Sequence, residues 1–331
     1  DLVDFGDFDG DGVNDIAIGW TQFTSGTDLR LSVYSLKAKT YKRVYSGSFT
    51  TMKVLDINND GKQDILLVEQ DTVAKKSTAR LVSYSCGRLS EIASVPLDST
   101  VSSYAELYET TVGKNDKGVL LDGYKGAHSM VTELVYWKNG SLQVPLYDKR
   151  SGTVISTFRD DPVACSDLDE DGTVEIPFPV VMQGYEKAAY SKKLWTVRWA
   201  DFAPATGSGS VFQTKFSCVI NSAEHYYFIL PGDLVKKTGF AGNVTVDKKN
   251  GDNDWIFCQW DPKSKSEGRL LFAIRSYTTQ EWSSLTNKKS LNVIYQNDLT
   301  TYAAILGQKQ GNDDPLYLTL DQIRNNFKII S

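Results

Sequence analysis

Three short stretches of the sequence place oxygen-bearing side chains at the same spacing. Counted from the first aspartate of each stretch, these side chains stand at positions 1, 3, 5 and 9, and a glycine stands at position 6. We name the stretches loop 1 (7–15), loop 2 (56–64) and loop 3 (167–175). Ca²⁺ takes about six to eight oxygen ligands, so the chain must curl tightly, and glycine tolerates the sharp turn. The spacing therefore predicts three calcium-binding loops.

The side chains at these positions are mostly carboxylates. They are Asp7, Asp9, Asp11 and Asp15 in loop 1, Asp56, Asn58, Asp60 and Asp64 in loop 2, and Asp167, Asp169, Asp171 and Glu175 in loop 3. By analogy with the EF-hand loop, the residue at position 7 offers a backbone carbonyl, and that residue is Val13, Lys62 or Thr173. An EF-hand keeps its last carboxylate at position 12 before a helix, whereas here it stands at position 9 before an apolar run typical of a strand. Each loop is therefore expected to join the two strands of a β-hairpin.

The pattern of strand, D-x-[DN]-x-D-G-x-x-[DE] and strand resembles the FG-GAP or VCBS repeats of integrin-like β-propellers and of many bacterial surface proteins. Phe5-Gly6 matches the letters FG in the name FG-GAP. The resemblance implies that each loop joins the first two strands of a propeller blade and that the cation makes the hairpin rigid. It also implies that the twelve side chains given above are the metal ligands, with two to three Ca²⁺ ions bound.

The spacing of the loops indicates how the blades follow one another. Asp7 and Asp56 are 49 residues apart, close to the period of roughly 40–50 expected for blades, and Asp167 follows 111 residues after Asp56. The longer gap predicts a blade without ligands; its hairpin at 112–118 keeps only Asp116 near a ligand position, so no calcium is expected there. The fourth unit begins near Thr153. The predicted fold is mainly β, with residues 1–222 forming a propeller of four-stranded antiparallel blades, four of them visible and one more conceivable upstream.

Residues 223–331 contain strand patterns without the calcium repeat. Thr319 to Gln322 fits a helix capping box, and Leu320, Ile323, Phe327 and Ile330 recur at helical spacing. This part resembles a small α+β module appended to surface proteins of gut-type Firmicutes, so a smaller α+β domain ending in a helix is expected. The alternative is that 223–331 forms further degenerate blades.

Composition excludes several classes of function. The net charge is −5, and no basic stripe interleaved with aromatic residues indicates nucleic-acid binding. No run of about eighteen apolar residues indicates a membrane span. The four cysteines, Cys86, Cys165, Cys218 and Cys258, lie in or beside apolar patterns and are expected to be small buried side chains rather than disulfide partners. The two histidines, His128 and His225, stand in no catalytic motif.

The resemblance implies a non-catalytic, calcium-stabilised binding or adhesion module, monomeric, on an extracellular surface, recognising a protein or glycan. Because the chain begins almost inside a strand, we expect an upstream segment, which could carry a lipid anchor. One alternative is a calcium-dependent polysaccharide lyase or hydrolase, and another is a purely structural spacer of a surface lipoprotein. The enzyme alternative would use Asp160 and Asp161 as acids, with sugar platforms from Trp195, Trp199, Trp255 or Trp260.

Overall fold

The part of the chain that the structure describes is mainly β and contains five antiparallel sheets. A computed structural model describes residues 2–21, 29–36, 42–71, 73–204, 211–231, 243–249 and 253–330. Two compact units are distinguished by their internal contacts: unit 1 is Asp1–Pro177 with Asp201–Gln213, and unit 2 is Phe178–Ala200 with Thr214–Ser331. The predicted domain boundary at 222 falls inside the second stretch of unit 2.

The first three sheets are four-stranded, and their strands lie in chain order. Sheet 1 contains β1 (Leu2–Gly6), β2 (Asp15–Thr21), β3 (Leu29–Ser35) and β4 (Lys42–Phe49). Sheet 2 contains β5 (Thr51–Leu55), β6 (Asp64–Asp71), β7 (Lys76–Ser85) and β8 (Arg88–Leu97). Sheet 3 contains β9 (Ser103–Val112), β10 (Asp116–Tyr124), β11 (Met130–Lys138) and β12 (Ser141–Gln143). The prediction of four-stranded antiparallel units is confirmed for these three.

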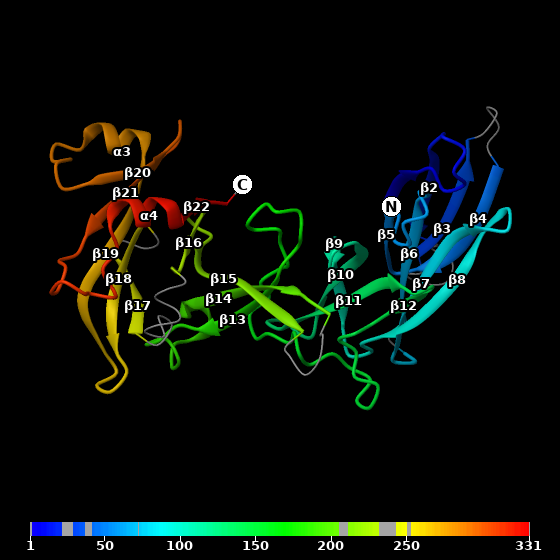
Figure 1. Ribbon diagram of the computed structural model, residues 1–331, viewed down its shortest axis with the longest axis horizontal. Coiled ribbons are helices and arrows are strands. Elements are labelled where there is room, and N and C mark those ends of the chain that lie inside the picture. Colours follow the sequence, from blue (N-terminus) through cyan, green and yellow to red (C-terminus); the bar gives the residue numbers. More distant parts are fainter. Residues whose placement is uncertain are drawn as a thin grey trace. The chain divides into compact units, whose positions relative to one another are not determined.

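Sheet 2 is apolar on both faces. Because side chains alternate along a strand, Ile65 and Leu67 of β6 point to the opposite face from Leu66 and Val68. The first pair belongs to a core shared with Ala17 and other residues of sheet 1, while the second pair shares a core with residues of sheet 3. Figure 1 shows sheets 1 and 2 side by side in blue and cyan. Burial of each such aliphatic side chain stabilises the fold by about 1.5–3 kcal/mol, so sheet 2 ties its two neighbours together.

The fourth unit is not a four-stranded blade, and this part of the prediction is wrong. Its expected first strand at 163–165 is followed by a single bridge, between Ser166 and Glu175. Side chains take the backbone groups that a strand would use: Asp122 Oδ2 accepts from the Cys165 N–H at 2.7 Å, and Arg159 Nε donates to the Val163 carbonyl at 2.8 Å. The segment therefore forms no ladder with its neighbour.

The strands after loop 3 belong to a five-stranded sheet with the order β13-β14-β15-β16-β22. Their bounds are β13 (Ile176–Val181), β14 (Trp195–Phe202), β15 (Phe212–Asn221), β16 (Tyr226–Ile229) and β22 (Phe327–Ile329). A short 3-10 helix, η2 (Tyr190–Lys192), precedes β14.

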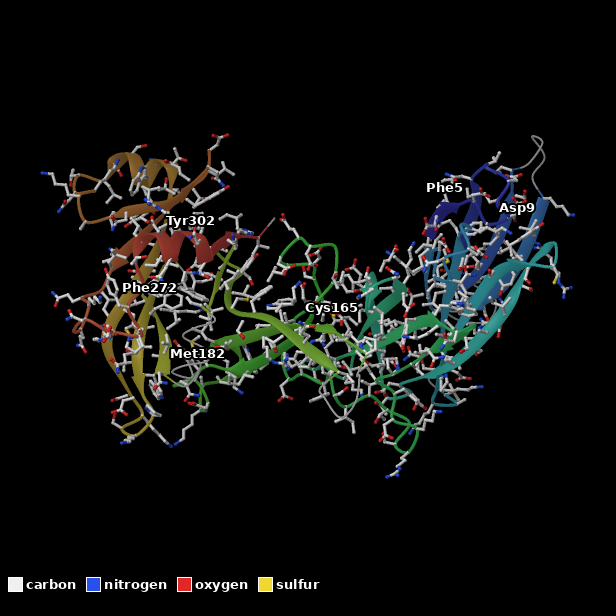
Figure 2. The ribbon with its side chains drawn as sticks, in the orientation of Figure 1. Phe5, Asp9, Cys165, Met182, Phe272 and Tyr302 are labelled. Carbon is white, nitrogen blue, oxygen red and sulfur yellow. The ribbon has the colours of Figure 1, made fainter. Side chains whose placement is uncertain are left out.

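The fifth sheet has the order β17-β18-β19-β21-β20. Its strands are β17 (Val244–Lys249), β18 (Asp254–Asp261), β19 (Ser266–Thr278), β20 (Asn292–Gln296) and β21 (Thr300–Leu306). An aromatic core joins it to β16, with the ring centroids of Phe257 and Phe272 4.2 Å apart and Phe228 within 5.3 Å of Phe257. Phe272 and Tyr302, which are labelled in Figure 2, both belong to this core.

The C-terminal capping box is confirmed, but the unit does not end in a helix. Thr319 caps α4 (Leu320–Asn326) reciprocally with Gln322. Phe327 then adopts extended backbone, packs 5.0 Å from the Tyr302 ring and opens β22, which pairs with β16. The aromatic cluster therefore ends the helix before Phe327 and Ile330 can extend its apolar face. The other described helix, α3 (Thr279–Ser284), has a capping box of its own at Thr278. No helix among the described residues has the length and apolarity to cross a membrane.

Candidate metal centres

Loops 1 and 2 join the first two strands of sheets 1 and 2, and loop 3 leads into β13. Their turn glycines, Gly12, Gly61 and Gly172, have φ of 84°, 86° and 86°, and a Cβ at any of them would meet no atom within 4 Å. Backbone conformation, and not space, therefore favours glycine at this position.

The same hydrogen bonds recur in all three loops. The N–H of the turn glycine donates to the aspartate at position 1, at 2.8 Å from Gly12 to Asp7, 3.0 Å from Gly61 to Asp56 and 2.9 Å from Gly172 to Asp167. The N–H groups of Val13, Lys62 and Thr173 donate to the position-5 aspartates at 2.9 Å. The carbonyls of Val13, Lys62 and Thr173 stay predicted ligands.

Loop 3 gathers its four acidic side chains most completely. Asp167, Asp169, Asp171 and Glu175 each bring a carboxylate oxygen within 4.8 Å of the others, and in loop 1 Asp7, Asp9 and Asp11 meet the same limit. Figure 2 shows Asp9 at one end of sheet 1. Asp15 is not part of the loop 1 group. In loop 2, Asn58 Nδ2 instead donates to Asp60 Oδ2 at 3.3 Å, and the described residues there form no group of three carboxylates. Two acidic clusters can thus hold a metal ion.

The acids at position 9 are buried. Asp15, Asp64 and Glu175 expose 2%, 0% and 0% of their surface. Asp64 accepts from the Ile57 N–H at 3.2 Å and Glu175 from the Leu168 N–H at 3.0 Å, but Asp64 Oδ1 and Glu175 Oε1 are buried without any hydrogen-bond partner.

Burial raises the pKa of all three carboxyls, to about 6 for Asp64 and to about 8 for Glu175, where the charges of Asp169, Asp201 and Asp167 raise it further. A buried carboxylate oxygen costs free energy unless it is paired. A cation supplies the missing partner and offsets the mutual repulsion of the group, so the donor set fits a metal ion.

The chain matches no known protein-family profile and no curated protein. Among solved structures it is similar to a Bacillus licheniformis rhamnogalacturonan lyase, with 13% identity, a TM-score of 0.39 and coverage of 64% of this chain and 48% of that one. The match to the rhamnogalacturonan lyase YesW has 12% identity and a TM-score of 0.39 and covers 64% of this chain and 48% of that one. The match to the exotype rhamnogalacturonan lyase YesX has 10% identity and a TM-score of 0.39 and covers 82% of this chain and 55% of that one. The chain spans about half the length of these lyases.

Neighbouring loops touch one another. Asn59 Nδ2 in loop 2 donates to the carbonyl of Asn115, in the hairpin of sheet 3, at 3.2 Å. The Lys62 side chain of loop 2 packs against Gly10 of loop 1, since a Cβ added to Gly10 would lie 2.8 Å from Lys62 Cε. Lys62 Nζ lies 4.8 Å from the centre of the Tyr84 ring. In the third hairpin Asp116 pairs with Lys138 at 3.3 Å, and the absence of calcium there stays a prediction.

Sequence reasoning missed two buried polar networks in unit 1. Glu133 accepts from the Asp98 N–H and from the Tyr104 hydroxyl, both at 2.8 Å, and Asp98 pairs with Lys125 at 2.6 Å. Asp122 pairs with Arg159 at 2.8 Å, with 0% and 1% of the two side chains exposed. The available signal was a single charge inside each of the apolar runs VLLDGY and VTELVYW.

The residues named for the enzyme alternative belong to two units, Asp160 and Asp161 to unit 1 and the four tryptophans to unit 2, and Asp161 and Trp195 are half-buried. Trp199, Trp255 and Trp260 are buried, so they serve as core rather than as sugar platforms, while Asp160 is exposed on the surface. All four cysteines are free and three are buried as expected, but the expectation is wrong for Cys86. That residue is exposed because it occupies a tight turn with a φ of 52°.

Proposed function

We propose that this chain is a non-catalytic, calcium-stabilised binding module of the β-propeller type, related to FG-GAP or VCBS repeat proteins, which acts on an extracellular surface. The observation that supports the proposal most directly is the environment of the Glu175 carboxylate. Its carboxylate is fully buried, one oxygen lacks any partner, and three further carboxylates approach within 4.8 Å. Only a bound cation makes this arrangement favourable in ionised form.

The donor set favours calcium over other cations. Every candidate side-chain ligand in the three loops is an oxygen, with no sulfur or imidazole for zinc. The loops offer several carboxylates and a backbone carbonyl, which suits the high coordination number of Ca²⁺ better than the strict octahedron of Mg²⁺. Loops of this kind fill where free calcium is near millimolar, as it is outside cells.

The sheets support the propeller. Three successive four-stranded sheets pack face to face, each begins with the strand that leads into its loop or hairpin, and their period is that of blades. The ions would make one end of the hairpins rigid and so present the neighbouring loops as a fixed surface for a protein or glycan partner.

The test is metal content by mass spectrometry after dialysis, together with melting curves in calcium, magnesium and EDTA. Two to three calcium ions per chain and a lower melting temperature in EDTA are expected. At free calcium one hundred times Kd each site adds about 2.7 kcal/mol to the stability of the folded state. Hydrogen exchange supplies an internal control: EDTA should deprotect the hairpins of unit 1 and leave β18 and β19 of unit 2 unchanged. Metal-loaded protein whose melting does not respond to EDTA would contradict the proposal.

A further inference from the structure

A cavity of about 500 Å³ lies beside loop 1, and three of the side chains that line it are basic. Its walls include Asp9 and Asp15 of loop 1, Lys42 and Arg43 of β4, and Tyr84 and Arg88 of the β7–β8 hairpin. We call it the basic cavity. Its volume falls within the ~300–1,000 Å³ typical of ligand pockets, and it is built from two neighbouring sheets of unit 1.

The three cations of the basic cavity have no partner within the described chain. Lys42, Arg43 and Arg88 are exposed, and none of their side chains forms an ion pair or hydrogen bond with a described residue. Arg80, by comparison, pairs with both Glu69 and Glu91 at 3.4 and 3.3 Å. Unpaired guanidinium groups in a concave site are suited to a ligand that carries a carboxylate.

Local backbone features place these cations at the cavity. In β4 the register shifts between Val33 and Tyr34, so Arg43 faces Tyr34 and Val44 is the extra residue of a bulge, a feature that redirects side chains. In sheet 2, Cys86 and Gly87 form a two-residue turn with φ of 52° and 81°, which returns the chain so that Arg88 lies opposite Ser85.

The internal repeat shows that the charge is particular to this site. Sheet 2 has the same bulge, and there the positions equivalent to Lys42 and Arg43 are Ser90 and Glu91. The hairpin architecture therefore does not require cations at these positions.

A calcium ion in loop 1 would change the balance of charge in the cavity. Asp9 and Asp15 oppose the three cations, so the lining has one more positive than negative side chain. An ion held by the loop 1 group, to which Asp9 belongs, would offset the charge of Asp9 and make the cavity more positive. Carboxylate oxygens can meanwhile accept hydrogen bonds from hydroxyl groups. The cavity thus combines sites for a carboxylate with sites for hydroxyl donors.

We propose that the basic cavity binds the carboxylate of a uronic acid sugar, with Arg43 and Arg88 holding the carboxylate and the acids of loop 1 accepting sugar hydroxyls. This inference rests on the proposed function, because it requires the loop 1 ion. It narrows the partner from a protein or glycan to an acidic glycan. Neutral sugars lack the charge that the two arginines recognise.

The test titrates the calcium-loaded protein with glucuronate and galacturonate and with their disaccharides, using calorimetry. Glucose and galactose are the neutral controls, and glucose 6-sulfate tests whether any anion suffices. A fluorophore on Cys86, the single exposed cysteine of the chain, reports binding next to Gly87 and Arg88 independently. Saturable binding of the uronates, with the neutral and sulfated sugars at least about tenfold weaker, is expected.

Variants localise the binding. Arg43→Ala and Arg88→Ala should each lower the affinity about tenfold or more, because each removes a charge-assisted hydrogen bond, and should leave the calcium-dependent melting shift intact. Arg150→Ala removes an exposed arginine elsewhere in unit 1 and should change nothing. EDTA should weaken uronate binding at least about fivefold.

Several outcomes would overturn the inference. These are absence of uronate binding up to about 10 mM in protein whose calcium shift is intact, equal binding of neutral or sulfated sugars, and unchanged binding in the double arginine variant. Uronate binding that persists unchanged in EDTA would also refute the role of the ion. Failure of calcium to bind at all would refute the proposed function instead, so the two failures are distinguishable.

Discussion

The backbone N–H of Gln63 donates a hydrogen bond to the carbonyl of Asp7 at 3.0 Å. Asp7 is the first candidate ligand of loop 1, and Gln63 directly precedes Asp64, the last candidate ligand of loop 2. The two loops also touch through side chains, since a Cβ on Gly6 would lie 2.9 Å from Gln63 Cβ. An ion that orders one loop therefore also restrains the residues of the other loop that contact it.

We expect calcium binding to loops 1 and 2 to be coupled. Asp11→Ala should abolish binding in loop 1 and lower the affinity of loop 2 two- to tenfold, since one hydrogen bond contributes ~0.5–1.5 kcal/mol. Asp171→Ala is the matched control, because it makes the same change in loop 3 and should leave loops 1 and 2 unaffected. Calcium titrations followed by hydrogen exchange in each hairpin give the separate affinities. An unaltered loop 2 in the Asp11 variant would show that the contact transmits nothing.

Glu175→Gln should have opposite effects on the metal-free and the calcium-loaded protein. Burial raises the pKa of Glu175 to about 8 without metal, so the stability that the protonated group contributes is lost as pH rises through this value. In EDTA at about pH 9 the variant should therefore melt higher than the natural chain, because its amide is neutral and can donate to Asp167 or Asp169. In calcium it should melt lower, because a charged ligand is gone. Melting curves that shift in the same direction in both conditions would contradict a metal role for Glu175.

The loops could be predicted from the sequence because their geometry is local. Each loop contains only nine residues, and the hydrogen bonds that Gly12, Gly61 and Gly172 donate reach an aspartate five residues earlier in the chain. The inner strands of the first three sheets follow from short apolar runs that are bounded by these turns, such as Ile65 to Val68 in β6. Local spacing therefore sufficed for the two acidic clusters, in loops 1 and 3, and for the first three four-stranded sheets.

The fourth unit could not be predicted because distant side chains decide its structure. Asp122 and Cys165 are separated by 43 residues, yet the carboxylate of the first takes the N–H that a strand at 163–165 would need. The residue pattern of 163–165 does not indicate that a distant side chain binds this N–H in place of a neighbouring strand. The basic cavity likewise depends on residues from β4 and from the β7–β8 hairpin, which the sequence does not place together.

Arg159→Met should unfold the entrance to loop 3. Arg159 donates from Nη2 to Asp122, from Nη1 to Thr132 and from Nε to the Val163 carbonyl, at 2.8 Å in each case. Its removal leaves the Asp122 carboxylate buried without its cation, which typically costs about 3–5 kcal/mol. We expect that loss in chemical denaturation and a calcium stoichiometry lower by one.

Arg159→Lys tests whether geometry or charge matters at this position. A lysine keeps the positive charge but lacks the planar fork that reaches three acceptors, so we expect only partial rescue. Full stability in the lysine variant would show that the charge alone suffices. Retention of calcium in loop 3 of the methionine variant would separate this network from the metal site.

Glu133 should make unit 1 less stable as pH rises towards neutrality. Burial raises its pKa from 4.5 to about 7, although the Asp98 N–H and the Tyr104 hydroxyl both donate to it. A raised pKa in the folded state means that the stability contributed by the protonated group is fully present below about 4.5 and is lost as pH rises through about 7. Since one pKa unit corresponds to ~1.4 kcal/mol, the expected loss is about 3 kcal/mol.

Glu133→Gln isolates this effect. The amide can still accept from the Asp98 N–H and can donate to the Tyr104 oxygen, whose own hydroxyl hydrogen can turn to Ser77 Oγ at 3.1 Å. The variant should therefore match the natural chain near pH 4.5 and exceed its stability by about 3 kcal/mol above pH 7. Asp98 works in the opposite direction, because hydrogen bonds from Lys125, Thr100 and Val154 outweigh its burial and lower its pKa. Since Asp98 is present in both proteins, the difference between them reports Glu133 together with its charge interaction with Asp98.

The measurement is urea denaturation of calcium-loaded protein at half-unit steps of pH, with Glu109→Gln as the control. Glu109 is an exposed carboxylate of the same sheet, 3.8 Å from Lys117, and its replacement should change stability by less than ~1 kcal/mol at any pH. A constant difference between the Glu133 variant and the natural chain across the range would show that Glu133 does not titrate there. A variant that becomes less stable above pH 7 would show that the ionised carboxylate is needed to hold Asp98 and Tyr104 in place.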